Sequence, residues 1–186
     1  MTILIVDNLS PFTSNILECI DKLGGRYIYK KFSEIMNDND NNLSYDKVIL
    51  SGRKKNSKEC NVTNSRIIKD CFLNDIAILG ICYGAEIIAL TLGGTMYRMN
   101  SYIQGTIAVK VLKSSSLIPD KKLIRVYESH RYCISKLPES FDSLASSQFC
   151  KHEVFLHKKK KIFGTQFHPE KSGQDGFTLF SNFLKL

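Results

Sequence analysis

Residues 77–94 have the sequence AILGICYGAEIIALTLGG, in which an apolar run reaches a cysteine and passes directly into a helical pattern. The run is typical of a buried β-strand, and the apolar spacing after Gly84 predicts a helix. Gly80 and Gly84 flank Cys82, and glycine permits the sharp turn and the close packing that such a junction needs. The pattern therefore predicts a strand, a tight turn and a helix, with Cys82 at the turn.

Strand and helix patterns alternate on the N-terminal side of this unit. The run TILIVDN at 2–8 predicts a buried strand, and residues 11–25 predict a helix that two glycines end. Further strands are expected at 26–32 and 45–52, and another helix at 65–75. This alternation predicts a parallel sheet with helices on both of its faces.

After Gly94 the pattern changes to short segments such as IAVKVL at 107–112 and LIRVYES at 123–129, which are typical of antiparallel strands and hairpins. The aromatic spacing of GFTLFSNFLKL at 176–186 predicts a final amphipathic helix. We therefore predict one α/β domain over residues 1–186. Its central, mostly parallel sheet is flanked by helices, and a small antiparallel region lies in the C-terminal half.

Composition argues against several classes of function. The chain has 186 residues, 43% of them hydrophobic, and no apolar run approaches the roughly 20 residues of a membrane-spanning helix. The start MTILIVDN has no basic region or cleavage site of a signal peptide, so we expect a cytoplasmic protein with no membrane partner. The net charge of +8 lies partly in GRKKNSK at 52–58 and HKKKK at 157–161. Aromatic residues do not interleave with these clusters, so no nucleic-acid partner is expected.

Six cysteines are scattered along the chain without a C-x-x-C pair. This predicts reduced thiols, with neither a zinc site nor a disulfide framework. Cys133 and Cys150 have no neighbouring base motif, so we expect them to serve in packing. His152 and His157 flank an expected hairpin with HKKKK at its tip, and we expect both at the surface. His130 suits a structural role and a role at a substrate or partner face equally well.

Two motifs together predict nucleophilic catalysis. Cys82 stands at the end of a strand and the start of a helix, where unpaired N–H groups and positive potential lower the pKa of a thiol. GTQFHPEKSG at 164–173 places His168 after an apolar strand and Glu170 two residues later, on the same side of an extended backbone. A cysteine nucleophile needs a base and a group that orients the base. We therefore predict a triad of Cys82, His168 and Glu170, against the alternative of a buried cysteine and a surface histidine.

The motifs GICYG and QFHPE, at this spacing, resemble those of the class I glutamine amidotransferases, and the resemblance covers essentially the whole chain. LIVDNLSPFTSNI at 4–16 resembles the glutaminase subunit of anthranilate synthase. YESHRYCISKLPESFDSLASS at 127–147 resembles the stand-alone glutaminase subunit of GMP synthase. FHPEKSG with the closing NFL is similar to the glutaminase subunit of imidazole glycerol phosphate synthase. The GMP synthase type is the leading interpretation and the anthranilate synthase type the alternative.

The resemblance implies a flavodoxin-like fold and a defined reaction. Cys82 attacks the side-chain amide of L-glutamine, and His168, oriented by Glu170, protonates the departing ammonia. Water then releases glutamate from a cysteinyl thioester. The resemblance further implies that ammonia passes to a synthase partner and that the reaction requires no cofactor or metal.

The resemblance also implies a substrate site around the triad. The backbone N–H of Tyr83, which follows the nucleophile, is one expected oxyanion donor. The loop after the third strand, with Gly52 and Arg53, is expected to supply the other. Gly105 and Thr106 match the segment that contacts the amino-acid end of glutamine.

The chain departs from the family pattern at two places. Arg53 replaces the glycine that normally offers its N–H, and a positive φ there would cost about 1–2 kcal/mol. Glu86 stands where a glutamine usually contacts the substrate, and Ala85 where histidine is common. An ionised carboxylate accepts hydrogen bonds but does not donate them, so we expect Glu86 to weaken glutamine binding or to shift substrate preference. Two further interpretations remain: a regulatory relative that has lost glutamine turnover, and a hydrolase of another γ-glutamyl amide.

Overall fold

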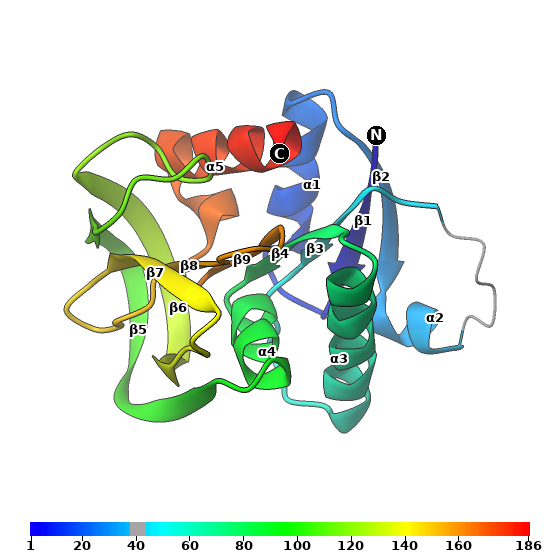
Figure 1. Ribbon diagram of the computed structural model, residues 1–186, viewed down its shortest axis with the longest axis horizontal. Helices are drawn as coiled ribbons and strands as arrows, with labels where there is room; N and C mark the ends of the chain where they lie inside the picture. The colour runs from blue at the N-terminus through cyan, green and yellow to red at the C-terminus, as the bar shows by residue number, and fades with distance from the viewer. Residues whose placement is uncertain (38–43) are drawn as a thin grey trace.

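The computed structural model describes residues 1–37 and 44–186, and these form a nine-stranded sheet with helices on both faces (Figure 1). The strands are β1 (Thr2–Asp7), β2 (Arg26–Lys31), β3 (Lys47–Leu50), β4 (Ala77–Ile81), β5 (Thr95–Val111), β6 (Leu123–Lys136), β7 (Phe141–Ser146), β8 (Val154–His157) and β9 (Ile162–Thr165). The helices are α1 (Thr13–Lys22), α2 (Phe32–Asn37), α3 (Lys58–Leu73), α4 (Tyr83–Thr91), the 3-10 turn η1 (Pro169–Lys171) and α5 (Gly173–Lys185). Strand order across the sheet is β2-β1-β3-β4-β9-β8-β7-β5-β6.

The parallel half of the sheet consists of β2, β1, β3, β4 and β9. Every residue of β3 and β4 is buried, because helices cover both faces, and this explains why these strands are apolar throughout except at Lys47, whose Nζ donates to the backbone oxygen of Phe183. The carboxyl ends of these strands meet at one edge, where the loops after β3, β4 and β9 lie together.

The sheet divides the hydrophobic core into two layers, each covered by the helices on that face (Figure 1). Side chains of β1 alternate between them: Ile3 and Ile5 pack with α1 and α5, whereas Leu4 and Val6 pack with α3 and α4. This arrangement and the mixed sheet confirm the predicted α/β fold. The helix α3 begins earlier than the spacing predicted, because the Ser57 hydroxyl accepts the backbone N–H of Cys60 and so caps its first turn.

The antiparallel half continues the same sheet. β5 and β6 form a long ribbon, and β7 pairs with both β5 and β8. The ribbon curls toward the parallel half (Figure 1), and Tyr127 of β6 makes an isolated antiparallel bridge with His168. The loop after β9 is therefore held by strands from both halves.

Three expectations about cysteines and histidines were wrong. Cys133 and Cys150 form a disulfide, so the expectation of reduced thiols in packing roles fails for this pair, while the other four cysteines are free. His152 and His157 are each only 8% exposed. Nδ1 of His157 accepts the N–H groups of residues 159 and 160, so the imidazole is drawn beneath the lysine-rich hairpin tip.

Candidate active site

Cys82 lies at the junction of β4 and α4 in a backbone conformation that side-chain-bearing residues rarely adopt. Its φ is 51° and its ψ is −107°. Hydrogen bonds fix this turn on both sides: the Cys82 N–H donates to Thr165 O at 2.7 Å, and the Glu86 N–H donates to Cys82 O at 2.9 Å. Because α4 begins at Tyr83, the N–H groups of its first turn have no acceptors within the helix. The turn thus presents both a thiol and free donors.

The two glycines beside Cys82 are required by backbone contacts. A Cβ atom on Gly80 would lie 2.3 Å from Gly84 O, and a Cβ atom on Gly84 would lie 2.3 Å from Leu50 O. Neither distance is compatible with a side chain. The glycines therefore let α4 approach β3 and β4 closely, as the sequence predicted.

His168 follows β9 and is held from several directions. Its Nδ1 lies 2.7 Å from Oε1 of Glu170, and its backbone N–H donates to Tyr127 O at 2.9 Å. The ring packs edge-on against Phe12 at 4.8 Å between centroids. With Nδ1 engaged by the carboxylate, Nε2 is the nitrogen left for chemistry.

The structure brings Cys82 and His168 together, although they are far apart in the sequence. Burial raises the pKa of the Cys82 thiol, and the charge and hydrogen bond of His168 oppose this increase. Burial lowers the pKa of His168, but Glu170 and then Cys82 raise it by more, so the pKa stands well above its usual range. Gly52 borders both groups, since a Cβ there would lie 3.0 Å from Cε1 of His168 and 3.7 Å from Cβ of Cys82. Such a site can transfer a proton between a nucleophilic sulfur and an imidazole.

The loop that carries Gly52 is fixed by buried polar residues that the sequence analysis did not single out. Asn8 Nδ2 donates to Ser51 O at 2.9 Å, and the Asn8 N–H donates to the Ser51 hydroxyl at 2.9 Å. Asn64 Nδ2 in turn donates to Asn8 Oδ1 at 2.7 Å. The position of Asn8 could have predicted this contact, because Asn8 directly follows β1, which pairs in parallel with β3.

Arg53 does not take the positive φ that the family pattern suggested. Among the described residues, the non-glycine residues with positive φ are Leu9, Asp75 and Cys82. The Arg53 guanidinium stacks on the Tyr83 ring at 3.7 Å and donates to Asn61 Oδ1 at 2.6 Å. The expected strain at Arg53 is therefore absent, and its side chain is bound to α3 and α4.

Glu86 is buried next to the triad and accepts a hydrogen bond from Nε2 of Gln166 at 3.1 Å. Burial raises the pKa of the Glu86 carboxyl, and the Gln166 hydrogen bond opposes the rise. A carboxyl group with a raised pKa carries a proton over a wider pH range, and in that form it donates as well as accepts. The expectation that Glu86 weakens glutamine binding applies to the ionised form alone.

Gly105 and Thr106 lie on β5, opposite Glu128 and Tyr127 of β6. Because Tyr127 also bridges His168, this part of β5 lies one strand away from the imidazole. Gly105 has a φ of +125°, and a Cβ atom there would meet no atom within 4 Å. The glycine therefore provides an unusual backbone conformation beside open space.

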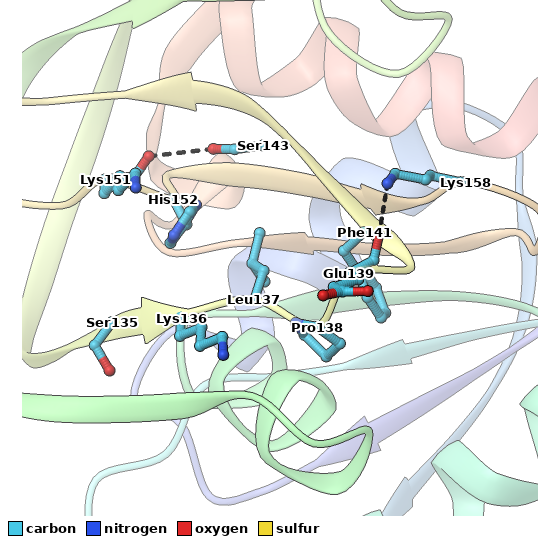
Figure 2. Close-up of a pocket in the computed structure, with 10 residues that line it drawn as sticks. All are labelled: Ser135, Lys136, Leu137, Pro138, Glu139, Phe141, Ser143, Lys151, His152 and Lys158. Carbon is cyan, nitrogen blue, oxygen red and sulfur yellow. Dashed lines mark hydrogen bonds between the residues drawn. The ribbon is translucent and has the colours of Figure 1, made fainter.

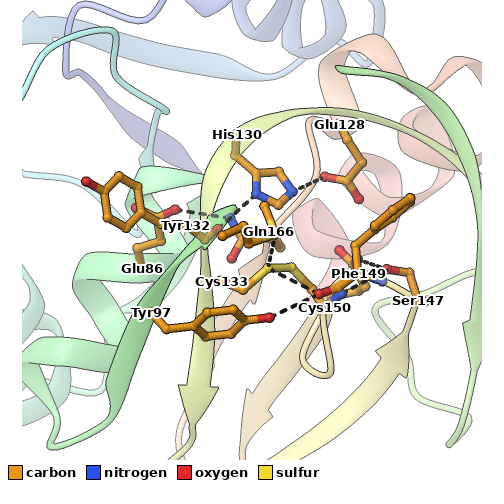
Figure 3. Close-up of a disulfide and its surroundings, with 12 residues drawn as sticks. Glu86, Tyr97, Glu128, His130, Tyr132, Cys133, Ser147, Phe149, Cys150 and Gln166 are labelled. Atoms are coloured by element: carbon orange, nitrogen blue, oxygen red, sulfur yellow. Dashed lines mark hydrogen bonds and ion pairs between the residues drawn. A yellow bond between two sulfur atoms is a disulfide. The ribbon is translucent and has the colours of Figure 1, made fainter. Parts of the chain in front are cut away.

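A buried polar cluster extends from Glu86 through Gln166 to His130 and Glu128 (Figure 3), and Glu153 adjoins Glu128. Nε2 of His130 lies 2.8 Å from Oε2 of Glu128, and Nδ1 of His130 lies 2.9 Å from Tyr132 O. Burial raises the pKa of Glu128 to about 7 and, together with the Glu128 charge, raises the pKa of Glu153 to about 9. His130 is thus a buried histidine of this cluster. The sequence did not predict the cluster, because its members lie in separate segments, such as YESH at 127–130 and KHEV at 151–154, that form no recognisable motif.

Potential metal ligands gather at one place in the described part of the chain. One ligand atom each from His130, Cys133 and Cys150 lie within 4.8 Å of one another. The disulfide ties up both sulfurs, and a bonded sulfur is not the thiolate that metal ions bind (Figure 3).

The family is decided by comparison with known proteins. The family model described as "Glutamine amidotransferase class-I" matches residues 4–186. The chain belongs to this family. A GMP synthase (glutamine-hydrolyzing) subunit of Methanocaldococcus jannaschii is 30% identical to this amidotransferase over 187 residues, which cover 99% of the chain and 96% of that protein.

Two further relatives define the extent of the similarity. The crystal structure of a putative GMP synthase subunit from Thermoplasma acidophilum superposes on the amidotransferase with a TM-score of 0.87 and 30% identity, covering 100% of this chain and 92% of that one. GMP synthase (glutamine-hydrolyzing) of Wigglesworthia glossinidia brevipalpis is 28% identical over 194 residues, or 98% of this chain. The amidotransferase chain spans only 37% of the length of that longer relative. The resemblance to the class I glutamine amidotransferases, and within them to GMP synthase, is confirmed. No helix in residues 1–37 and 44–186 is long and apolar enough to cross a membrane.

Proposed function

We propose that the chain is the glutaminase subunit of a two-component amidotransferase of the GMP synthase type. It hydrolyses L-glutamine to glutamate and ammonia and delivers the ammonia to a synthase subunit. The observation that supports this proposal is the meeting of Cys82, in its strained turn, with an imidazole already bound to Glu170.

The reaction proceeds in two halves. Cys82 gives its proton to Nε2 of His168, and its sulfur forms a bond to the amide carbon of glutamine. The carbon–nitrogen bond breaks as His168 gives the proton to the departing ammonia, which leaves a γ-glutamyl thioester. His168 then takes a proton from water as the water oxygen attacks the thioester. The carbon–sulfur bond breaks, glutamate leaves, and the proton returns to the Cys82 sulfur.

The backbone around the thiol supplies the remaining groups. The N–H of Tyr83, at the start of α4, and the N–H groups of the loop at Gly52 and Arg53 hold the negative oxygen of the tetrahedral intermediate. Gly105 and Thr106 contact the amino-acid end of glutamine across the open space beside β5.

Glu86 contacts the substrate in place of the usual glutamine. In its protonated form the carboxyl group donates a hydrogen bond to the substrate while its other oxygen accepts from Gln166. In its ionised form it repels the substrate carboxylate, so glutamine binding depends on the protonation state of Glu86.

The names of the relatives support GMP synthase over anthranilate synthase as the type of partner. Ammonia must travel to the acceptor without being protonated by water, so the two subunits enclose a dry route between them. We place both subunits in the cytoplasm, and the reaction as written needs only glutamine and water.

The test uses glutamine labelled with ¹⁵N at its amide. The chain is combined with the synthase subunit captured from native extract, and glutamate release and the labelled product are measured together. We expect glutamate release to depend on the partner, the label to enter GMP, and Cys82→Ala to abolish both. Label in anthranilate would instead support the alternative partner, and an absence of glutamate release under all conditions would support the regulatory relative that Glu86 suggests.

A further inference from the structure

A pocket lies apart from the proposed amidotransferase site, between the end of β6, the turn that follows it, β7 and the turn before β8 (Figure 2). Its volume is about 490 Å³, which is enough for a small metabolite. None of the residues proposed for glutamine hydrolysis lines it.

The rim of the pocket is basic. Lys136, Lys151 and Lys158 line it, and all three are exposed. The carboxylate among the lining residues is that of Glu139, which leaves an excess of positive charge. Nζ of Lys158 donates to the backbone oxygen of Glu139 at 2.5 Å, and since an ammonium has three donors, two remain for a ligand.

A buried histidine lies between these lysines. His152 is 8% exposed, and its Nδ1 is buried without a hydrogen-bond partner. Figure 2 shows the ring directed from its turn toward the wall formed by Lys136 and Leu137. Burial, followed by the charge of Lys151, lowers the pKa of His152 and favours the neutral ring. In the neutral form with its proton on Nε2, the buried Nδ1 carries only a lone pair. The Nε2–H group can then donate a hydrogen bond to an anion.

The turn that carries His152 is fixed before any ligand binds. The disulfide joins Cys133 of β6 to Cys150, two residues before His152. The Ser143 hydroxyl donates to Lys151 O at 3.2 Å, and the Glu153 N–H donates to Ala145 O at 2.9 Å. A rigid wall lowers the entropic cost of ligand binding, because this part of the pocket does not have to become ordered when the ligand binds.

We propose that this pocket binds a small phosphate-bearing molecule. Lysines of the basic rim pair with the phosphate, as lysine does at many phosphate sites, and His152 donates to one of its oxygens. Leu137 and Phe141 provide an apolar wall for the organic part of the ligand. This site is independent of glutamine hydrolysis, and neither proposal depends on the other.

The test is a titration of the full chain with inorganic phosphate, ribose 5-phosphate and a purine mononucleotide, with the uncharged nucleoside as a fourth arm. The chain has four histidines, so NMR resolves the imidazole signals, and the signal missing from His152→Asn assigns His152. We expect saturable shifts of the His152 signal and an increase in its pKa with the phosphate-bearing probes. Loss of one charge-assisted contact weakens such binding by about tenfold, which we expect for Lys136→Gln and Lys158→Gln.

Lys22→Gln on α1, outside the pocket, is the matched control and should leave the affinity unchanged. A thermal melt of each variant establishes that it is folded before its affinity is compared. Shifts that do not saturate, equal weakening by Lys22→Gln, or equal binding of the nucleoside would each overturn the proposal.

Discussion

The backbone of Cys82, at the carboxyl edge of the sheet, adopts an energetically unfavourable conformation. A non-glycine residue in a sparsely populated conformation costs about 1–3 kcal/mol and persists where its surroundings determine it fully. Here the hydrogen bonds of Cys82 to Thr165 and Glu86 and the packing of Gly84 against Leu50 provide that determination. The same close packing leaves no room for a side chain at Gly80 or Gly84.

At the same scale, Glu170 controls the pH range in which His168 carries a proton. The carboxylate raises the pKa of His168 against the effect of burial, so the ring stays protonated to higher pH. We expect Glu170→Gln to lower the pKa of His168 and to move the alkaline limb of the pH profile of kcat/KM to lower pH. The measurement is glutamate release with the partner present across pH, and an unmoved alkaline limb would contradict the role assigned to Glu170.

Glu86 gives a second prediction that depends on pH. Its pKa is raised by burial, so the carboxyl is neutral below that pKa and ionised above it. We expect the KM for glutamine to rise with pH as Glu86 ionises, and Glu86→Gln to give a lower KM without this dependence. Glu59→Gln, an exposed substitution on α3, serves as the control. If Glu86→Gln leaves KM unchanged, Glu86 does not contact glutamine as proposed.

At the scale of elements, the position of α4 depends on Gly84. In Gly84→Ala the new methyl group lies 2.3 Å from Leu50 O, so α4 must move, and overpacking of this kind typically costs about 1–3 kcal/mol. Gly24→Ala meets no atom within 4 Å but keeps a φ of +68°, so it costs about 1–2 kcal/mol through strain alone. We expect both variants to lose stability in urea unfolding, and only Gly84→Ala to lose glutaminase activity as well. Retention of full activity by Gly84→Ala would contradict the described contact.

The elements also show which parts of the molecule local sequence determines. β3 and β4 were predictable because both of their faces are buried, which gives apolar runs, and because Gly52 follows β3 and Gly80 lies near the end of β4. α2, of six residues, is too short for its spacing to be recognised. The burial of His152 and His157 was missed because it depends on how β7 and β8 pack against more distant segments, which no local pattern records.

The same distinction holds for the site. Cys82, His168 and Glu170 could be predicted as a group because each belongs to a short motif with chemical meaning, and the structure brings the three residues together. The Asn8–Ser51–Asn64 support was missed because its members come from three separate elements. Pairing of Cys133 with Cys150 depends on the register of β6 against the turn before β8, so spacing alone did not predict it.

At the scale of the whole molecule, the disulfide acts on the unfolded chain. It joins residues 17 apart, and a loop of that size is associated with about 3 kcal/mol of stabilisation. We expect a reductant, or the double substitution of Cys133 and Cys150 by serine, to lower the unfolding free energy by about this amount in urea denaturation. Cys19→Ser, which removes a free cysteine, is the control. Equal unfolding free energies with and without reductant would contradict a formed disulfide.

The bridge between Tyr127 and His168 has a consequence for how the architecture could change. It joins β6, the outermost strand, to the loop after β9, so the series β9, β8, β7, β5 and β6 returns on itself at His168. A sheet margin that is occupied in this way offers less template for pairing with another chain. A slip of one residue in the register of β5 against β6 would therefore displace His168, whose backbone N–H donates to Tyr127 of β6.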